Sequence, residues 1–162
     1  MKTGIGSHTN PAGGKDEWLT PPDIINALGP FYMDPCAAIH QPWETAIKHL
    51  TILDDGLNQQ WKGRIWCNPP YGKETGNWLK KMAEHGDGIA LTFARTETRM
   101  FFKYVWPRAS ALLFLEGRLH FYNISGKRAT GNAGGPSVLI AYGIECAHIL
   151  KNCGLKGKFV YT

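Results

Sequence analysis

Short apolar runs and amphipathic helical patterns alternate along most of this chain. Apolar runs predict buried strands at 31–34, 50–53, 64–67, 88–94, 111–115 and 137–142. Apolar residues spaced three and four apart predict helices at 21–28, 43–49, 75–85, 96–106 and 144–151. Because strands alternate with short helices and several strands are apolar throughout, we expect an α/β fold. Its sheet should be mostly parallel, with helices on both faces.

The N-terminal residues differ in composition from the rest of the chain. Residues 1–15 are rich in Gly, Ser and Asn and have few apolar side chains, which is typical of a flexible N-terminal arm. The first helix is expected to begin with Thr20 as its N-cap and Pro21 in its first turn, and to stop at Gly29-Pro30. No internal repeat divides the remainder, so residues 16–162 are expected to form a single domain.

Composition narrows the class of protein. The formal net charge of +5 permits a polyanionic partner such as nucleic acid without requiring one. No apolar run approaches the ~20 residues needed to span a bilayer, so no membrane association is expected. The four cysteines (Cys36, Cys67, Cys146 and Cys153) have no CxxC spacing and are interpreted as reduced thiols of a cytoplasmic protein. The histidines show no metal-ligand spacing, so no metal is expected.

The most informative motif is Asn68-Pro69-Pro70-Tyr71, called here the Asn-Pro-Pro-Tyr loop, directly after an apolar strand. Two prolines fix the backbone and cannot donate hydrogen bonds, so this loop is rigid. It presents a carboxamide, free carbonyls and an aromatic ring at the carboxyl end of a strand, where α/β sheets bind ligands. These groups suit a flat amino-heterocycle such as adenine. The alternative is a proline-rich surface turn or recognition peptide, although PxxP spacing is absent.

Two acidic strand ends are further candidates. Asp34-Pro35-Cys36-Ala37-Ala38 places a carboxylate beside small residues, which allow a nucleoside to approach the backbone. Asp54-Asp55-Gly56 could offer a carboxylate to ribose hydroxyls, and the sequence does not decide which aspartate does so. Taken alone, each motif is more typical of an ordinary turn.

In this order, the motifs resemble the small phage and prophage DNA adenine-N6 methyltransferases that use S-adenosylmethionine. The resemblance covers about residues 16–143. It includes Glu17-Trp18-Leu19-Thr20-Pro21, the Asp34 and Asp54 motifs, Trp61, Trp66 to Gly72 and Gly117-Arg118-Leu119-His120-Phe121. It implies a Rossmann-like class I methyltransferase fold, reduced by about one strand–helix unit, with its last strand, at 137–142, antiparallel. It also implies an enzyme encoded by a phage or prophage and acting in the bacterial cytoplasm.

The resemblance assigns roles to individual residues. The Asn-Pro-Pro-Tyr loop would hold an adenine flipped out of double-stranded DNA. The S-adenosylmethionine pocket would contain Trp18, Thr20, Pro21, Asp34, Pro35, Cys36, Ala37 and either Asp54 or Asp55. The widespread Phe-x-Gly-x-Gly cofactor loop is absent, and Cys36-Ala37-Ala38 stands in its place.

Basic residues are candidates for holding DNA phosphates. They are Arg64, Lys73, Arg95, Arg99, Arg118, Lys127 and Arg128. Residues 117–135, called here the 117–135 segment, also interleave His120, Phe121 and Tyr122 among these cations, which suits a DNA-contacting loop with stacking side chains. A plain hairpin insertion with solvated surface cations is the alternative.

Other functions are compatible with the motifs. Asn-Pro-Pro-Tyr loops also serve RNA adenine, cytosine N4 and protein glutamine, and a non-catalytic DNA-binding protein could keep the same sheet. The oligomeric state, a monomer or a weak dimer, is left open by the sequence.

Overall fold

The computed structural model describes residues 18–162, and the arm expected at 1–15 lies outside the described residues. The strands are β1 (Met33–Asp34), β2 (Lys48–His49), β3 (Ile65–Cys67), β4 (Gly88–Phe93), β5 (Ala111–Leu115), β6 (Ser137–Tyr142) and β7 (Gly157–Tyr161). The helices are α1 (Pro22–Leu28), α2 (Thr75–His85), α3 (Arg99–Tyr104) and α4 (Ile144–Asn152), with a 3-10 turn η1 (Ile52–Asp54).

The described strands form one seven-stranded sheet in the order β2-β1-β3-β4-β6-β5-β7. The four strands β2, β1, β3 and β4 are parallel. β6 is antiparallel to both β4 and β5, and β7 is antiparallel to β5. The expectation of a mixed α/β fold with a mostly parallel core is therefore confirmed. The strand at 137–142 is antiparallel as expected, but it is not the last one, because β7 follows it.

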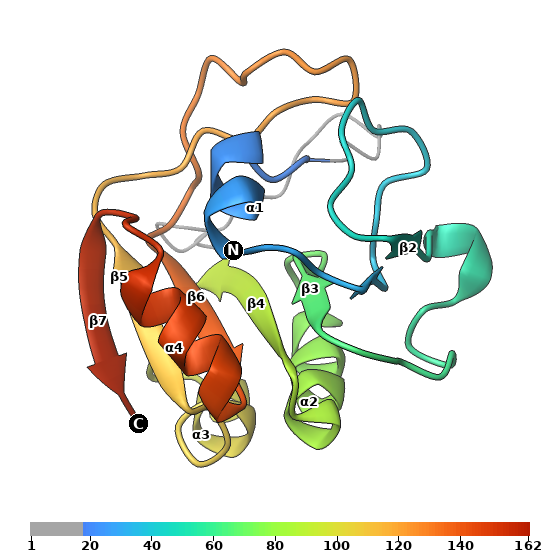
Figure 1. The fold of residues 1–162 in the computed structure, drawn as a ribbon. Helices are drawn as coiled ribbons and strands as arrows, with labels where there is room; N and C mark the ends of the chain where they lie inside the picture. Colours follow the sequence, from blue (N-terminus) through green and yellow to red (C-terminus); the bar gives the residue numbers. More distant parts are fainter. Residues whose placement is uncertain (1–17) are drawn as a thin grey trace, which may run out of the picture.

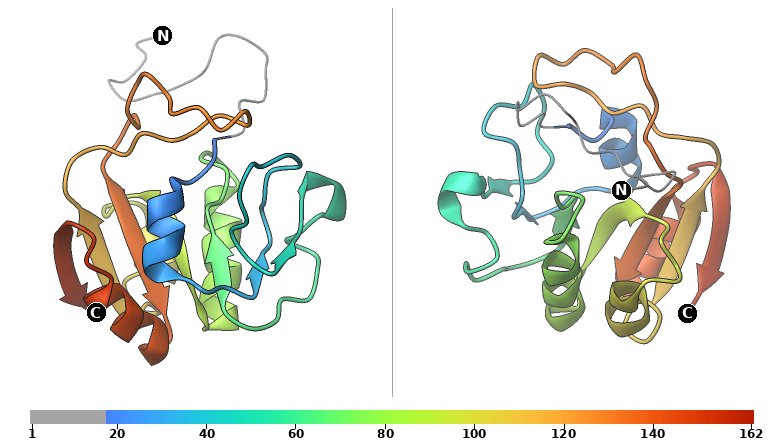
Figure 2. Two further views of the ribbon diagram at one scale, coloured as in Figure 1. Left: turned by 45° about the horizontal axis from the view of Figure 1, so that its top comes forward. Right: turned by 180° about the vertical axis from the view of Figure 1, so that it is seen from behind.

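Helices cover both faces of the sheet, as predicted (Figures 1 and 2). α1 and α4 pack on one face, against strand residues that include Trp66 and Leu139. α2 and α3 pack on the other face, against Ile65, Cys67 and their neighbours. Ile65, Trp66 and Cys67 are all buried, although successive residues of a strand point to opposite faces. This double burial explains why β3 has an uninterrupted apolar sequence.

The region between β1 and β3 differs from the prediction. No helix forms at 43–49, because the ring Nε2 of His49 accepts hydrogen bonds from the backbone N–H groups of Thr45 and Ala46. These bonds hold the segment as bends leading into β2. The strand expected at 50–53 is also wrong. Thr51 and Asp54 form a capping box that winds this stretch into η1.

Three smaller boundaries also differ. α1 is present, but Pro21 occupies the N-cap position and the side chain of Thr20 bonds elsewhere. α3 begins at Arg99 rather than 96, because the Thr98 hydroxyl donates to the Arg95 carbonyl and closes a turn before the helix. α4 is not the terminal element, since β7 continues the sheet beyond β5.

The 117–135 segment connects the end of β5 to the start of β6 and lies above that end of the sheet (Figure 1, orange). Tyr122 exchanges two backbone hydrogen bonds with Leu19, of 2.7 and 3.0 Å, just before α1. Tyr122 also packs edge-on against Trp43, with ring centroids 5.3 Å apart. The segment is therefore joined both to the start of α1 and to the chain that precedes β2.

Candidate active site

Three neighbouring parallel strands bring polar and aromatic residues to one edge of the sheet. β1 ends at Asp34, β3 leads into Asn68, and β4 ends at Phe93. The carboxyl ends of parallel strands meet at the same edge, which is where open α/β sheets bind ligands. The Asn-Pro-Pro-Tyr loop therefore lies beside the acidic strand end.

The loop is fixed to the start of α2. The Thr75 hydroxyl donates to the Pro70 carbonyl at 2.7 Å and accepts from the backbone N–H of Gly72 at 3.0 Å. Thr75 is the first residue of α2 and is only 3% exposed. These bonds, together with the prolines, restrict the loop to one conformation.

The carboxamide of Asn68 is held from the segment before α1. Its Nδ2 donates a 3.2 Å hydrogen bond to the hydroxyl of Thr20, a residue that is 3% exposed. Within residues 18–162, no hydrogen bond uses the Oδ1 of Asn68 or the carbonyl oxygen of Pro69. The loop thus has two acceptor oxygens, on adjacent residues, that the fold leaves unused.

An aromatic group stands beside these acceptors. The Tyr71 ring is 38% exposed and stacks on Phe93, with centroids 4.3 Å apart and planes 22° from parallel. Phe121 of the 117–135 segment approaches the same ring at 6.4 Å with its plane tilted by 68°. Partial burial raises the pKa of the Tyr71 hydroxyl above its ordinary value, so this side chain is a neutral ring rather than a base.

Asp34 is buried, and its hydrogen bonds stabilise the fold. Its two carboxylate oxygens accept hydrogen bonds from the Cys36 backbone N–H at 3.1 Å and the Thr45 hydroxyl at 2.5 Å. Burial raises its pKa from 3.8 to about 6, although these bonds and the nearby His49 act in the opposite direction. The carboxylate therefore shapes the chain after β1 and ties it to the segment before β2.

The second acidic motif packs against the first. Gly56 lies so close to the Pro35 carbonyl that a Cβ atom at this position would overlap it. The Asp54 carboxylate caps η1 by accepting from the backbone N–H of Thr51, which lowers its pKa. Asp55 is exposed, and within the described residues its carboxylate is hydrogen-bonded through Oδ2 alone, which accepts from Asn58 at 2.6 Å. The fold thus engages Asp54 and leaves an oxygen of Asp55 available.

The remaining cofactor candidates are distributed around this edge. Cys36 and Cys67 bring their sulfur atoms within 3.8 Å of each other, and this contact and burial raise the pKa of the Cys36 thiol. Trp18 is 47% exposed beside Leu19, and Ala37 is buried, with its N–H donating to the Leu50 carbonyl. Pro21 is buried at the start of α1.

The basic candidates do not form one surface. Arg118, His120 and Arg128 line a common pocket with the start of α1. The exposed residues Lys73, Arg95, Arg99 and Lys127 follow the carboxyl ends of strands or lie in the 117–135 segment. Arg64 precedes β3 and lies at the opposite end of that strand from Asn68, with its Nε 3.9 Å from Asp87. The structure thus separates Arg64 from the loop.

Three further findings concern metal binding, membrane spans and a second cavity in the described part of the chain. No group of three or more His, Cys, Asp or Glu side chains in this part of the chain could hold a metal ion. No helix among residues 18–162 is long and apolar enough to cross a membrane. A cavity of about 650 Å³ between α1 and residues 44–47 contains none of the loop residues.

Comparison with known protein families decides the class. The model of the family described as DNA N-6-adenine-methyltransferase (Dam) matches residues 6–145, which is most of the chain. The chain belongs to the Dam family. It is therefore a DNA adenine methyltransferase, and the resemblance seen in the sequence is confirmed. Neither a search of curated proteins nor a search of solved structures gave a match.

Two residues of this Dam-family site were missed in the sequence. Phe93 ends a buried strand, and only the parallel pairing of β3 with β4 reveals that its ring meets Tyr71. Thr45 holds Asp34 from a segment for which the sequence favoured a helix. The neighbouring strand ends of a parallel sheet were the one available clue to Phe93.

Proposed function

We propose that this Dam-family protein transfers a methyl group from S-adenosylmethionine to the N6 amino group of adenine in DNA, with the base held by the Asn-Pro-Pro-Tyr loop. One observation carries the proposal. The Nδ2 of Asn68 is bound to Thr20, while the Oδ1 of Asn68 and the Pro69 carbonyl are left without donors. Two adjacent acceptors match the two hydrogens of an amino group.

These acceptors address the difficulty of the reaction. The adenine amino nitrogen is a poor nucleophile because its lone pair is delocalised into the ring. Hydrogen bonds from the amino group to Asn68 and Pro69 favour a tetrahedral nitrogen with a localised lone pair. Alignment and electrostatic stabilisation by fixed groups are then the main contributions. Tyr71 provides a ring on which the base can stack, in an aromatic group that already contains Phe93.

The sheet order supports the Rossmann-like class I assignment. The antiparallel β6 lies between β4 and β5, whose directions agree. The expected reduction agrees with the region between β1 and β3, where the structure has only β2 and η1.

S-adenosylmethionine supplies a methyl group on a positively charged sulfur. The polar groups near the sheet edge fit its nucleoside, because one carboxylate oxygen of Asp55 is open to ribose hydroxyls and the next residue, Gly56, lies against the Pro35 carbonyl. Asp34 contributes by holding the chain that follows β1 in place through its hydrogen bonds to Cys36 and Thr45. We assign the cofactor to a surface formed by Trp18, Pro21, Asp34, Pro35, Cys36, Ala37 and Asp55.

The target adenine must leave the duplex to reach the loop. Extrusion of a base costs about a few kcal/mol, and it requires the flanking strand to be held. The cations at this edge, Lys73, Arg95, Arg99, Arg118, Lys127 and Arg128, together with His120 and Phe121, are the side chains we assign to DNA.

A direct assay tests this function. Labelled S-adenosylmethionine is incubated with the protein and unmethylated duplex DNA, and the DNA is digested for nucleoside analysis. We expect label in N6-methyladenine. Label in N4-methylcytosine would contradict the proposed base. Label only in RNA or protein substrates would contradict DNA as the substrate, and an absence of both transfer and cofactor binding would contradict catalysis.

A further inference from the structure

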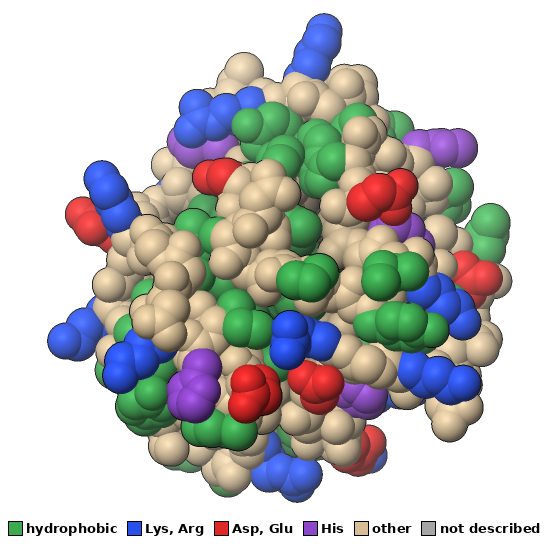
Figure 3. Space-filling model, viewed as in Figure 1, with side chains coloured by type: hydrophobic (Ala, Val, Ile, Leu, Met, Phe, Trp, Pro, Cys, Tyr) green, Lys and Arg blue, Asp and Glu red, His purple; other side chains and the backbone are tan. Residues whose placement is uncertain are grey.

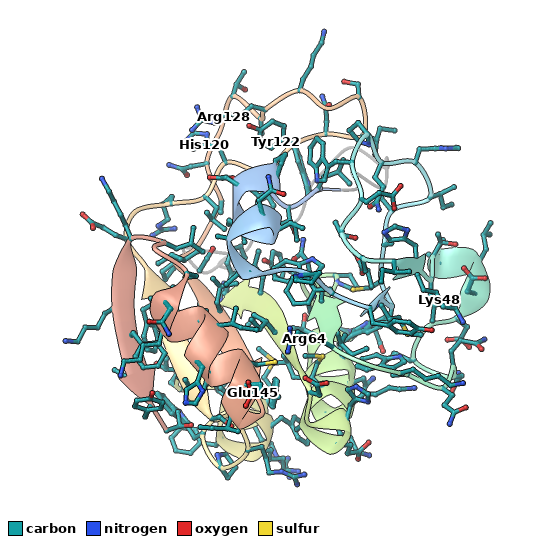
Figure 4. The ribbon with its side chains drawn as sticks, viewed as in Figure 1. Lys48, Arg64, His120, Tyr122, Arg128 and Glu145 are labelled. Atoms are coloured by element: carbon teal, nitrogen blue, oxygen red, sulfur yellow. The ribbon has the colours of Figure 1, made fainter. Side chains whose placement is uncertain are left out.

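A small pocket of about 170 Å³ lies where the start of α1 meets the 117–135 segment. The segment lines it with Arg118, His120, Tyr122 and Arg128, and the other wall contains Pro21, which precedes α1, and Asp23 of α1. Figure 4 shows His120, Tyr122 and Arg128 together above the first turn of α1. In the same region of Figure 3, blue and purple side chains lie together above a red one.

The charges of this pocket favour an anion. Its two guanidinium groups and one carboxylate sum to a charge of +1, without counting His120. Among residues 18–162, the guanidinium of Arg118 makes a single long hydrogen bond, of 3.5 Å, to the Ala133 carbonyl. Arg128 makes no side-chain hydrogen bond or ion pair with any residue from 18 to 162. Most of the donors in the pocket are therefore free to bind a ligand.

The pocket has a fixed position relative to Asn68. Tyr122, in its wall, is bonded through its backbone to Leu19, and it also forms a backbone bridge with Arg128. The residue after Leu19 is Thr20, whose hydroxyl accepts the bond from Asn68, and the next residue is Pro21 of the pocket. One short stretch of chain thus contacts both the pocket and the carboxamide.

We propose that this pocket holds one phosphodiester of the DNA strand that carries the target adenine. The inference rests on the proposed function. A guanidinium presents paired N–H donors that match two phosphate oxygens, and a pocket charge of +1 matches the single charge of a phosphodiester. A phosphate bound here holds the DNA strand beside the Asn-Pro-Pro-Tyr loop while the target adenine is flipped out of the duplex.

The test compares Arg128→Gln and Arg118→Gln with Arg108→Gln. The control removes the same charge from an exposed arginine that precedes β5, at the opposite edge of the sheet. Binding to fluorescent duplexes of several sequences is measured over a range of salt concentrations, and S-adenosylmethionine affinity is measured by calorimetry. Thermal unfolding of each variant confirms that it is folded.

We expect each pocket variant to weaken duplex binding about tenfold, equally for every sequence, and to reduce the salt slope by about 0.9. The control should bind like the wild type, and cofactor affinity should not change in any variant. Pocket variants that bind DNA like the control would overturn the proposal. A loss restricted to some sequences would show that the pocket reads a base, and weakened cofactor binding would show that it holds the cofactor carboxylate.

These outcomes are separate from failure of the proposed function. If the wild-type protein methylates adenine and the pocket variants match the control, only the phosphate site is wrong. If the wild-type protein transfers no methyl group to DNA, the proposed function itself fails.

Discussion

The hydrogen bond between Asn68 and Thr20 gives a sharp prediction. Replacing Thr20 by Val removes the hydroxyl and keeps a side chain of nearly the same shape in a site that is 3% exposed. The Nδ2 of Asn68 then loses its 3.2 Å acceptor, and the carboxamide is free to rotate. The Oδ1 no longer points reliably at the amino group of the substrate.

The size of the effect follows from the bond. A neutral hydrogen bond contributes about 0.5–1.5 kcal/mol net. Since about 1.4 kcal/mol corresponds to a factor of ten in rate, Thr20→Val should lower kcat by roughly twofold to tenfold. Stability should fall by about 1 kcal/mol, because a half-buried N–H group has lost its partner.

The assay is steady-state methyl transfer at saturating S-adenosylmethionine, with cofactor affinity and urea unfolding measured on the same samples. Thr20→Ser keeps the hydroxyl and should restore kcat, which a purely steric role would not explain. An unchanged kcat in Thr20→Val would refute the reasoning. An unchanged kcat together with weakened cofactor binding would instead place the hydroxyl at the cofactor, as the family resemblance implies.

Three further predictions concern neighbouring residues. Tyr71→Phe should keep activity, because the ring and not the hydroxyl contacts the base. Tyr71→Ala should lower kcat/KM about tenfold in the transfer assay, because stacking contributes about 1–3 kcal/mol per base. The pKa of Asp34 is raised from 3.8 to about 6, so the folded state binds the proton more tightly than the unfolded chain. The free energy of unfolding of the wild type, relative to that of Asp34→Asn, should therefore fall by up to about 3 kcal/mol as pH rises from about 4 to 7. Urea unfolding at several pH values measures this, and the same pH dependence in both proteins would contradict it. Gly56→Ala should cost about 1–3 kcal/mol and weaken cofactor binding because its Cβ meets the Pro35 carbonyl, whereas Gly131→Ala, which has open space around it, should match the wild type in both measurements.

The elements that the sequence predicted well are those whose own residues determine them. β3 is apolar throughout, and β6 is apolar after Ser137, because both faces of each strand are buried. α2 keeps its apolar residues on one side and ends at Gly86, which has the positive φ of 75° that favours glycine. In such segments the local pattern and the tertiary environment agree.

The errors occur where distant contacts decide the structure. β2 is only Lys48–His49, with no apolar residue, and it exists because it pairs with β1. The apolar stretch after it forms η1 because Thr51 and Asp54 make a capping box at its start. β7 has no fully buried residue, and it joins the sheet only by pairing with β5.

The candidate site shows the same division. The position of the Asn-Pro-Pro-Tyr loop after a buried strand could be read from the sequence. The partner of Asn68 could not, because Thr20 reaches it across 48 positions of chain. Nor could the separation of Arg64 from the loop, which depends on the direction of β3 relative to the edge that carries Asn68.

The most direct test of the central claim is methyl transfer by Asn68→Ala, with Asn152→Ala on the last turn of α4 as the matched control. We expect Asn68→Ala to lose N6-methyladenine formation while keeping its affinity for S-adenosylmethionine and a cooperative unfolding transition, with stability lowered by about 1 kcal/mol because the bond to Thr20 is lost. Asn152→Ala should match the wild type in methyl transfer and in cofactor affinity. Methyl transfer by Asn68→Ala at the wild-type rate would contradict the claim that this loop holds the adenine amino group, and a loss of cofactor binding in that variant would show that the base site has been placed where the cofactor binds.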